Sequence, residues 1–328
     1  MKVPLPGFVQ IEPVGQCNLA CRMCPVVLRG DGGPGKPPAF MPFETFCSLI
    51  DQFAGVRELH LQGLGEPMLH PRFFDMVAYA AARGIEVSTN TNLTALSDRR
   101  AEQCVRSGLA RMHVSLDAAD PAAYEYIRVG SRYARVLKNL QRILETRRRL
   151  GAALPEIRLV AVAMRRNLEE LPGLVRFAHE RAIAHVSVQH LAHDFTESTL
   201  PGKYADMRAF VDCETLLGED AARVEHWFGK ARAEAERLKI DLKLPRITQQ
   251  PGAAGCDWPW RGAYVAYSGE AMPCCMVATP DRVNFGNMAR EGVVQVWDNA
   301  AYNRFRDRLA SDSPPEICRG CAVYQGRF

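Results

Sequence analysis

Eleven cysteines are the residues of this 328-residue chain with the clearest potential for chemistry. Three of them, here called the N-terminal cysteines, follow a short apolar run with the spacing Cys-x3-Cys-x2-Cys: Cys17, Cys21 and Cys24. Thiolates at such spacing bind zinc or iron–sulfur clusters. Three thiolates on one loop suit three corners of a [4Fe–4S] cube and leave the fourth iron open, as a catalytic metal requires. The alternative is a zinc knuckle with a distant fourth ligand, which is unusual at the start of a strand–helix domain.

The N-terminal spacing, with Met23 before its last cysteine, resembles the signature of the radical S-adenosylmethionine (SAM) superfamily. In that family the amine and carboxylate of SAM bind the open iron. Reduction of the cluster then cleaves SAM to methionine and a 5′-deoxyadenosyl radical, which abstracts a hydrogen atom from the substrate. The resemblance also implies a (β/α)6 partial barrel.

Other motifs extend the resemblance to SAM-binding loops. Gly63-Leu64-Gly65-Glu66-Pro67 is similar to the family's Gly-Gly-Glu motif, where glycines let the backbone approach a ligand and a carboxylate accepts from an ammonium group. For Arg128 a SAM-carboxylate contact and an ordinary surface arginine remain equally open. Adenine is expected near Gln189–Leu191. The residues that the resemblance assigns to SAM are Gly63, Gly65, Glu66, Asn90, Ser115 and Arg128.

A second set, here called the C-terminal cysteines, comprises Cys256, Cys274, Cys318 and Cys321. The pattern Cys-x12-Gly-x4-Cys, with Gly269 as the glycine, resembles the opening of a SPASM domain, and the single Cys-x2-Cys pair that follows resembles its shorter "twitch" form. Four thiolates close a second [4Fe–4S] cluster, which can carry an electron but has no open iron. The alternative is a structural zinc site with four cysteine ligands.

Four cysteines lie outside both sets. Cys47, Cys104 and Cys213 have helical or apolar surroundings, which predicts small buried side chains. Cys275 adjoins a cluster ligand. It is either a bystander, an alternative ligand or a thiol that returns hydrogen to a substrate radical, and it is the one candidate catalytic residue.

Short apolar runs alternate with amphipathic stretches over residues 8–190, which predicts a parallel α/β sheet. The expected strands are 8–12, 57–61, 85–89, 111–116, 157–163 and 185–190, and the expected helices are 42–54, 71–83, 97–107, 133–150 and 168–182. Ser97 is the expected N-cap of one helix, and the expected glycines at helix ends are Gly84, Gly108 and Gly151.

The chain therefore divides into a radical SAM partial barrel over residues 1–190, a helical linker or cap over 191–250 and a small auxiliary-cluster domain over 251–328. In the middle part, helices are expected near 205–217 and 219–239, with Trp227 and Phe228 in the core. The boundary with the last part is expected between residues 245 and 256.

Charge and termini narrow the function class. A net charge of +4 and the lack of basic runs interleaved with aromatics argue against nucleic-acid binding. No stretch is apolar enough to span a membrane, and the N-terminus does not resemble a signal peptide. These features, with clustered cysteines, predict a cytoplasmic metalloenzyme.

The first strand begins at Phe8, which leaves no room for the extra N-terminal domain of many peptide-modifying relatives. The chain is more similar to small twitch or SPASM enzymes that tailor sugars, aminocyclitols and nucleosides in antibiotic biosynthesis. The leading expectation is thus oxidation of a secondary alcohol on a sugar-like substrate, with flavodoxin or ferredoxin as electron donor. The alternatives are epimerisation with Cys275 as hydrogen donor, decarboxylation of a sugar acid, and maturation of a peptide. No base is assigned, since a structural or a solvated role is favoured over a catalytic one for each of the candidates Glu12, His190, His193 and Asp194.

Overall fold

A computed structural model describes residues 3–29, 39–191, 195, 197–249, 255–277 and 279–327. Within these ranges one nine-stranded sheet has the order β7-β6-β5-β4-β3-β2-β1-β8-β9. Every neighbouring pair is parallel except β8 and β9. The strands are β1 (Phe8–Ile11), β2 (Glu58–Leu61), β3 (Glu86–Thr91), β4 (Arg111–Ser115), β5 (Glu156–Ala163), β6 (His185–His190), β7 (Asp241–Lys243), β8 (Gly262–Val265) and β9 (Ala271–Met272).

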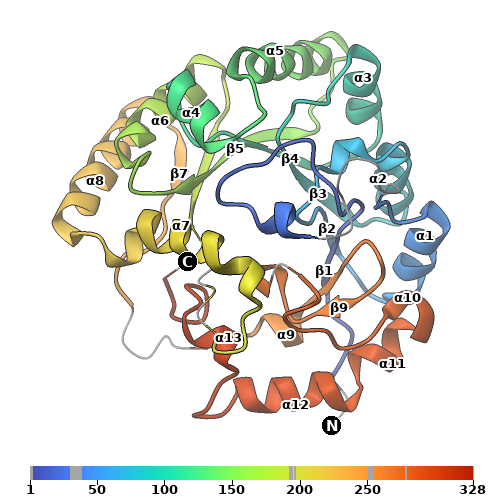
Figure 1. Cartoon of the computed structure of the whole chain (residues 1–328). Coiled ribbons are helices and arrows are strands. Elements are labelled where there is room, and N and C mark those ends of the chain that lie inside the picture. The colour runs from blue at the N-terminus through green and yellow to red at the C-terminus, as the bar shows by residue number, and fades with distance from the viewer. Residues whose placement is uncertain are drawn as a thin grey trace.

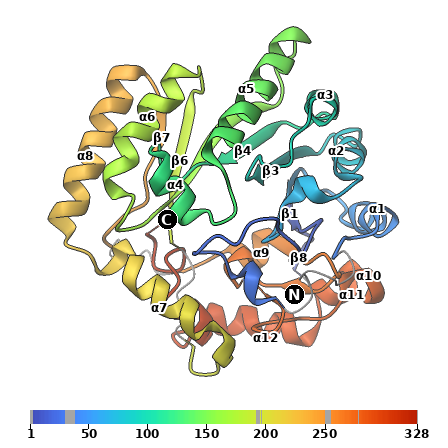
Figure 2. The same ribbon diagram turned by 45° about the horizontal axis from the view of Figure 1, so that its top comes forward.

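Helices form an arc around the outside of this curved sheet (Figures 1 and 2). The arc consists of α1 (Phe43–Gln52), α2 (Phe73–Ala81), α3 (Asp98–Arg106), α5 (Tyr133–Arg149), α6 (Leu171–Glu180) and α8 (Ala221–Leu238). The other α-helices are α4 (Pro121–Ile127), α7 (Ala205–Glu214), α9 (Trp258–Arg261), α10 (Met288–Glu291), α11 (Val293–Trp297), α12 (Ala300–Leu309) and α13 (Glu316–Arg319). Short 3-10 helices are η1 (Pro25–Leu28), η2 (Pro67–Leu69), η3 (Leu168–Glu170), η4 (Gly202–Tyr204), η5 (Leu216–Gly218) and η6 (Cys275–Val277).

The period-two pattern of the strands decides which face is covered. Val9 and Ile11 of β1 are fully buried in the main core beneath the helices, whereas the intervening positions face the concave side. On that side His60, His113 and Arg158 line a polar cavity of about 270 Å³. The concave face of the sheet is therefore the face that can carry a functional site.

Local signals place the predicted helices. The Ser97 side chain accepts a hydrogen bond from the backbone nitrogen of Arg100 at 3.3 Å, which confirms it as the N-cap of α3. Gly84, Gly108 and Gly151 follow helices α2, α3 and α5 with positive φ, as expected of glycines at helix ends. The α/β fold with a partial barrel is confirmed.

Three strands, β7, β8 and β9, were not predicted, and neither were six of the α-helices in the described ranges: α4, α9, α10, α11, α12 and α13. The three-residue β7 is too short to show periodicity, and β8 lies in the cysteine-rich part of the chain. Because β8 pairs in parallel with β1, the auxiliary region continues the sheet of the barrel. Helix α4, capped by Asp120 and started by Pro121, lies between the strand expected at 111–116 and the helix expected at 133–150, where no element was predicted.

The two α-helices of the segment 191–250 lie in different parts of the fold. Helix α8 packs against α6 in the outer arc, and α7 lies apart from that arc (Figure 1). Phe228 of α8 is buried as expected, and Trp227 is partly buried against the same core. No helix in the described ranges has both the length and the apolar character needed to cross a bilayer.

Candidate active site

The residues that the sequence analysis assigned to SAM and to the first cluster line one cavity. This cavity has a volume of about 210 Å³ and opens at the carboxyl ends of the first strands. It brings together residues that are up to 111 positions apart in the chain: Cys17, Cys21, Cys24, Gly63, Gly65, Glu66, Asn90, Ser115 and Arg128. In parallel α/β folds the functional loops gather at this end of the sheet.

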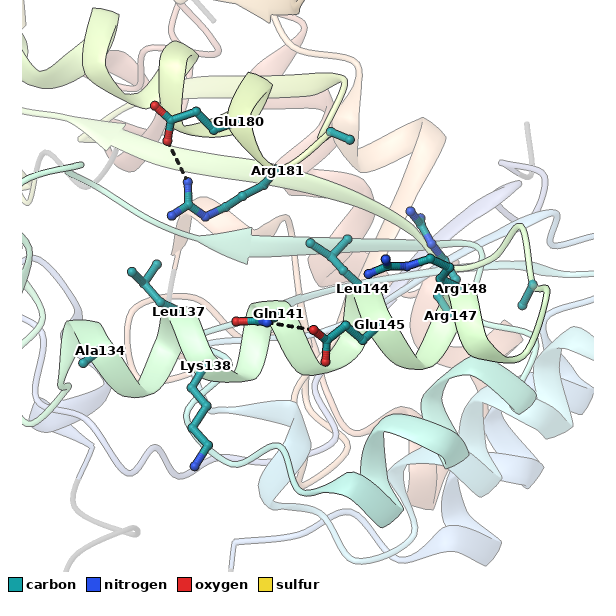
Figure 3. A pocket seen from close by; sticks show the side chains of 12 residues that line it. Ala134, Leu137, Lys138, Gln141, Leu144, Glu145, Arg147, Arg148, Glu180 and Arg181 are labelled. Carbon is teal, nitrogen blue, oxygen red and sulfur yellow. Dashed lines mark hydrogen bonds and ion pairs between the residues drawn. The ribbon is translucent and has the colours of Figure 1, made fainter.

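A larger hollow lies elsewhere. It has a volume of about 1090 Å³ and runs between α5 and α6 on the outer layer, lined in part by Leu137 and Leu144 (Figure 3). Two pairs of its polar side chains interact with each other: Gln141 donates to Glu145, and Arg181 pairs with Glu180. None of its lining residues is a cysteine or a predicted site residue, so we assign the chemistry to the smaller cavity.

The loop that carries the N-terminal cysteines is held by backbone hydrogen bonds on both sides of Cys21. The backbone nitrogens of Ala20 and Arg22 donate to the carbonyls of Val129 and Ile127 at 2.9 and 3.0 Å. These two acceptors lie at and just after the end of α4. The unpredicted helix α4 therefore positions the cysteine loop.

Glu66 is almost fully buried, and its carboxylate accepts three hydrogen bonds from the protein. The donors are Thr91 Oγ1 at 2.7 Å and the backbone nitrogens of Asn92 and Met68 at 2.8 and 3.1 Å. Burial raises the pKa of Glu66 despite these donors. A carboxylate has about four acceptor positions, so one remains for a ligand in the cavity.

The glycines of the Gly63–Glu66 turn are required by the protein itself. A β-carbon at Gly65 would lie 1.9 Å from the carbonyl oxygen of Val14, and one at Gly63 would lie 2.4 Å from the side chain of Glu12. Close approach to a ligand was the expected reason for these glycines. The structure adds that they let the turn pack against the chain that leads from β1 into the cysteine loop.

Glu12 connects the Gly63–Glu66 turn to the chain that leads from β1 into the cysteine loop. It is fully buried, forms a 2.8 Å ion pair with Arg29 and accepts a 2.8 Å hydrogen bond from the backbone nitrogen of Leu64. His190, another of the weighed bases, is also buried and contacts the carbonyl oxygen of Arg246 at 2.8 Å. Both have the structural roles that were expected. His193 and Asp194 lie outside the described residues.

Arg128 is buried rather than on the surface. Its Nε donates to Asp117 Oδ2 at 2.7 Å, and Asp117 is in turn fixed by the backbone nitrogen of Val162 at 2.8 Å. Burial acts to lower the pKa of Arg128, but the charges of Asp117 and Cys21 raise it overall. A buried, permanently charged guanidinium beside Cys21 is suited to an anionic ligand in the cavity.

Sequence reasoning missed Asn92. Its Nδ2 donates to the sulfur of Cys17 at 3.6 Å, and the backbone nitrogen of Leu19 donates to the same sulfur at 3.4 Å. Hydrogen bonds to cluster sulfurs tune the reduction potential of a cluster. Asn92 follows the predicted Asn90 by two positions, so the repeated asparagine at the end of β3 was the available signal.

The N-terminal cysteines are buried thiols in one another's field. Burial, the charge of Glu66 and the neighbouring cysteines raise the pKa of Cys17 to about 12, and burial and Cys21 raise that of Cys24 to about 12. Buried thiols become ligands when a metal centre stabilises their thiolates. Among the described residues no three His, Cys, Asp or Glu side chains converge on one point for a single ion. In a cube, by contrast, each cysteine binds a different iron.

The C-terminal cysteines also assemble. Burial raises the pKa of Cys274, and the charges of Cys275, Cys321 and Cys318 raise it further; burial and the charge of Cys321 raise that of Cys256. These residues come from the start of α9, the end of β9 and the region of α13. The donor set is a group of partly buried thiols, which fits an iron–sulfur cluster.

The remaining cysteines were only partly anticipated. Cys104 is fully buried in the core as expected, and Cys47 is half-buried. Cys213 is exposed on α7, so its assignment to the core is wrong. The apolar neighbours that suggested burial, such as Val211, face inward while Cys213 faces outward.

Comparison with known protein families decides the class. Residues 11–178, which are just over half of the chain, match the radical SAM superfamily. The chain belongs to that superfamily. Residues 256–322 match SPASM, described as an iron–sulfur cluster-binding domain. SAM and [4Fe–4S] clusters are therefore the cofactors of this radical SAM enzyme. The cavity fits SAM, and the N-terminal cysteines and the C-terminal cysteines each fit a cluster.

Relatives are similar over almost the whole chain. A protein named PqqA peptide cyclase from Xanthomonas campestris pv. campestris is 28% identical over 326 residues, covering 97% of this chain and 80% of its own length. A Pyrococcus furiosus protein is 23% identical over 316 residues, covering 91% of this chain and 83% of its own length. It is named as a cofactor-modifying protein of tungsten-containing aldehyde ferredoxin oxidoreductase.

Solved structures share the fold. Streptococcus suis SuiB bound to SAM has a TM-score of 0.70 at 17% identity, covering 98% of this chain and 72% of SuiB. The anSMEcpe protein with bound SAM has a TM-score of 0.62 at 14% identity, covering 98% of this chain and 84% of its own.

These relatives correct the expected substrate. The sequence analysis favoured a sugar-like small molecule and oxidation of a secondary alcohol, partly because β1 begins as early as Phe8. The relatives that match 97% of this chain are named for a peptide substrate, so both the reaction and the partner were wrong. The start of the first strand did not report on the substrate class.

Proposed function

We propose that this enzyme modifies a peptide by forming a covalent cross-link within it. The observation that carries the proposal is the similarity to PqqA peptide cyclases over 97% of the chain. SuiB, which has the same fold, is known in a structure with its precursor peptide SuiA. A fold of this kind therefore accommodates a peptide.

The roles of the cavity residues follow from their positions. The N-terminal cysteines hold the cluster that binds SAM, and SAM when bound supplies a 5′-deoxyadenosyl radical that abstracts hydrogen. Glu66 would offer its remaining acceptor position to the SAM ammonium group, and Arg128, fixed by Asp117 beside Cys21, would bind the SAM carboxylate. Ser115 would bind the ribose, as the family resemblance implies, and Asn90 lines the same cavity. The glycines Gly63 and Gly65 keep the turn close enough to the cysteine loop for these contacts.

Cross-linking removes two hydrogen atoms from the peptide and is a net oxidation, so the enzyme acts as an oxidoreductase. One hydrogen atom leaves with the SAM-derived radical, and the second leaves as a proton and an electron. The C-terminal cysteines would hold the auxiliary cluster, which would supply an acceptor for this electron. A cytoplasmic location stays a prediction, because thiol-bound clusters suit a reducing compartment.

The test uses the anaerobically reconstituted enzyme with SAM, a reductant and synthetic peptides. The sequences of these peptides are taken from short reading frames that neighbour the enzyme's gene. We expect a peptide product lighter by two hydrogen atoms, with 5′-deoxyadenosine formed in equal amount. Tandem mass spectrometry locates the cross-link. If no such peptide increases 5′-deoxyadenosine formation above the rate without substrate, the proposal is wrong.

Cys275 is tested in the same assay. It lies at the start of η6 beside Cys274, and burial followed by the charge of Cys321 raises its pKa to about 12. If it is a bystander, Cys275→Ala keeps its iron content and forms the product at the wild-type rate. Loss of about half the iron identifies it as a ligand instead. Full iron with accumulation of unmodified peptide and 5′-deoxyadenosine identifies it as a hydrogen donor.

A further inference from the structure

The buried carboxylate of Glu12 is shared by three segments that lie far apart in the chain. Its Oε1 accepts hydrogen bonds from the backbone nitrogens of Leu64 and Gly65 at 2.8 and 3.4 Å. Its Oε2 accepts from the Arg29 side chain at 2.8 Å and from the backbone nitrogen of Tyr267 at 3.4 Å. Because a carboxylate has about four acceptor positions, these four donors fill it. Glu12 therefore joins the SAM-binding turn to the auxiliary region and keeps no acceptor position for a ligand.

Tyr267 of the auxiliary region also contacts the chain that leads into the cysteine loop. A β-carbon at Gly15 would lie 2.3 Å from the Tyr267 ring, so the ring lies directly against the Gly15 backbone, two residues before Cys17. The backbone beside it is joined as well, since the nitrogen of Glu12 donates to the carbonyl of Val265 at 2.9 Å. The auxiliary region thus holds both ends of the stretch from Glu12 to Gly15.

Tyr267 lies in the turn of a hairpin whose two ends lead to cysteines of the auxiliary cluster. Strands β8 and β9 pair in antiparallel register, and the backbone nitrogen of Ala266 donates to the carbonyl of Glu270 at 2.9 Å across the turn. Cys274 follows β9 by two positions, and Cys256 precedes β8 by way of the short helix α9. A cluster bound to both cysteines would close the base of this hairpin. It would thereby restrict the turn that carries Tyr267.

We propose that Glu12 is a positioning residue through which the auxiliary cluster controls the binding of SAM. Neither Glu12 nor Tyr267 lines the SAM cavity, whereas Leu64 and Gly65 do, so Glu12 acts on SAM through the turn. With the auxiliary cluster in place, the hairpin holds Glu12 and the turn in the geometry that binds SAM. Without that cluster the turn loosens, and SAM is bound weakly as long as the acceptor for the second electron is missing. This inference rests on the proposed role of the turn in SAM binding.

The test measures SAM affinity by calorimetric titration of the anaerobically reconstituted enzyme without peptide. Glu12→Gln keeps the shape of the side chain but replaces one acceptor oxygen by a donor. Glu214→Gln is the matched control, because Glu214 is another buried carboxylate, is paired with Arg166 and does not line the cavity. Cys318→Ala/Cys321→Ala removes the auxiliary cluster. Iron content and electron paramagnetic resonance allow all variants to be compared at equal occupancy of the first cluster.

We expect Glu12→Gln to bind SAM roughly tenfold more weakly with full iron, and the double-cysteine variant to show a similar loss with about half the iron. Because both changes break the same link, combining them should weaken SAM binding no further than Glu12→Gln alone. Glu214→Gln should bind SAM like wild type. Wild-type affinity in Glu12→Gln or in the double-cysteine variant, losses that multiply in the combination, or an equal loss in Glu214→Gln would overturn the inference.

Tyr267→Ala gives the answer if the double-cysteine variant does not retain its first cluster. It removes the ring from Gly15 and leaves every cysteine in place, so it should lower SAM affinity as Glu12→Gln does. Tyr267→Phe keeps the ring and should bind SAM like wild type. Wild-type affinity in Tyr267→Ala would contradict the inference. Glu66→Ala is titrated alongside: if it weakens SAM binding and Glu12→Gln does not, the turn binds SAM and only the positioning role of Glu12 is wrong.

Discussion

The three hydrogen bonds to Glu66 allow a prediction with a worked magnitude. Glu66→Ala leaves the donors on Thr91, Asn92 and Met68 without their acceptor in a buried place. An unpaired buried donor costs about 1–3 kcal/mol, and water entering the vacated space recovers part of the sum. We therefore expect the unfolding free energy to fall by roughly 3–5 kcal/mol. Loss of the charge-assisted bond to the SAM ammonium group should weaken SAM binding roughly ten- to hundredfold.

Two measurements separate these effects. Anaerobic thermal denaturation reports the loss of stability, and calorimetric titration with SAM reports affinity in samples of equal iron content. Thr91→Val is the control, because it keeps the carboxylate and removes only one of its donors, together with the acceptor of the Leu93 backbone nitrogen. It should cost about 1–3 kcal/mol and leave SAM affinity near that of wild type. If Glu66→Ala binds SAM as tightly as wild type, Glu66 only supports the loop and its assignment to SAM is wrong.

Three further predictions concern the clusters, the Gly63–Glu66 turn and the polar interior. Reconstituted wild type should hold about eight iron atoms per chain, and alanine at all three N-terminal cysteines should halve the iron and abolish SAM cleavage; bound zinc or full iron would contradict this. Gly65→Ala should lose first-cluster iron and cost at least about 1–3 kcal/mol, because its β-carbon meets rigid backbone; an intact electron paramagnetic resonance spectrum of that cluster would contradict the packing argument. Burial lowers the pKa of His60 to about 3 and of His113 to about 4, whereas both titrate near 6.5 when unfolded. The stability from keeping them neutral is present above about pH 6.5 and is lost as the pH falls towards 4, so the melting temperature of wild type should drop between pH 7.5 and 5.5 more than that of His60→Gln/His113→Gln.

The sequence predicted the parts of the site that local motifs specify, and it missed the parts that depend on contacts between residues far apart in the chain. The spacing of the N-terminal cysteines and the Gly63–Glu66 motif are local, so the sequence could predict them, and the structure brings the residues assigned to SAM and to the first cluster to one cavity. The strand pairing between β1 and β8 joins residues more than 250 positions apart, and no local pattern reports it. The same limit hid the partners of Glu12 and the burial of Arg128, which depend on contacts between distant loops.

The substrate class was harder to predict than the fold. Radical generation is fixed by a few residues with strict spacing, whereas substrate recognition is spread over cavity walls with no short motif. The turn glycines illustrate a related difficulty. Sequence alone cannot separate a glycine that admits a ligand from one that admits a neighbouring loop, and Gly65 lies against Val14 in the protein itself.

The parallel pairing of β8 with β1 has a consequence for dissecting the enzyme. Removing everything after residue 250 would uncover the backbone edge of Phe8–Ile11, because it takes away β8, whose buried Ala263 and Val265 now lie beside that edge. An unprotected edge of this kind pairs readily with other chains. The truncated barrel should therefore aggregate, and its cysteine loop, which begins a few residues beyond that edge, would lose its anchor. The radical-generating and auxiliary parts are in this sense one folding unit that cannot be exchanged as separate modules.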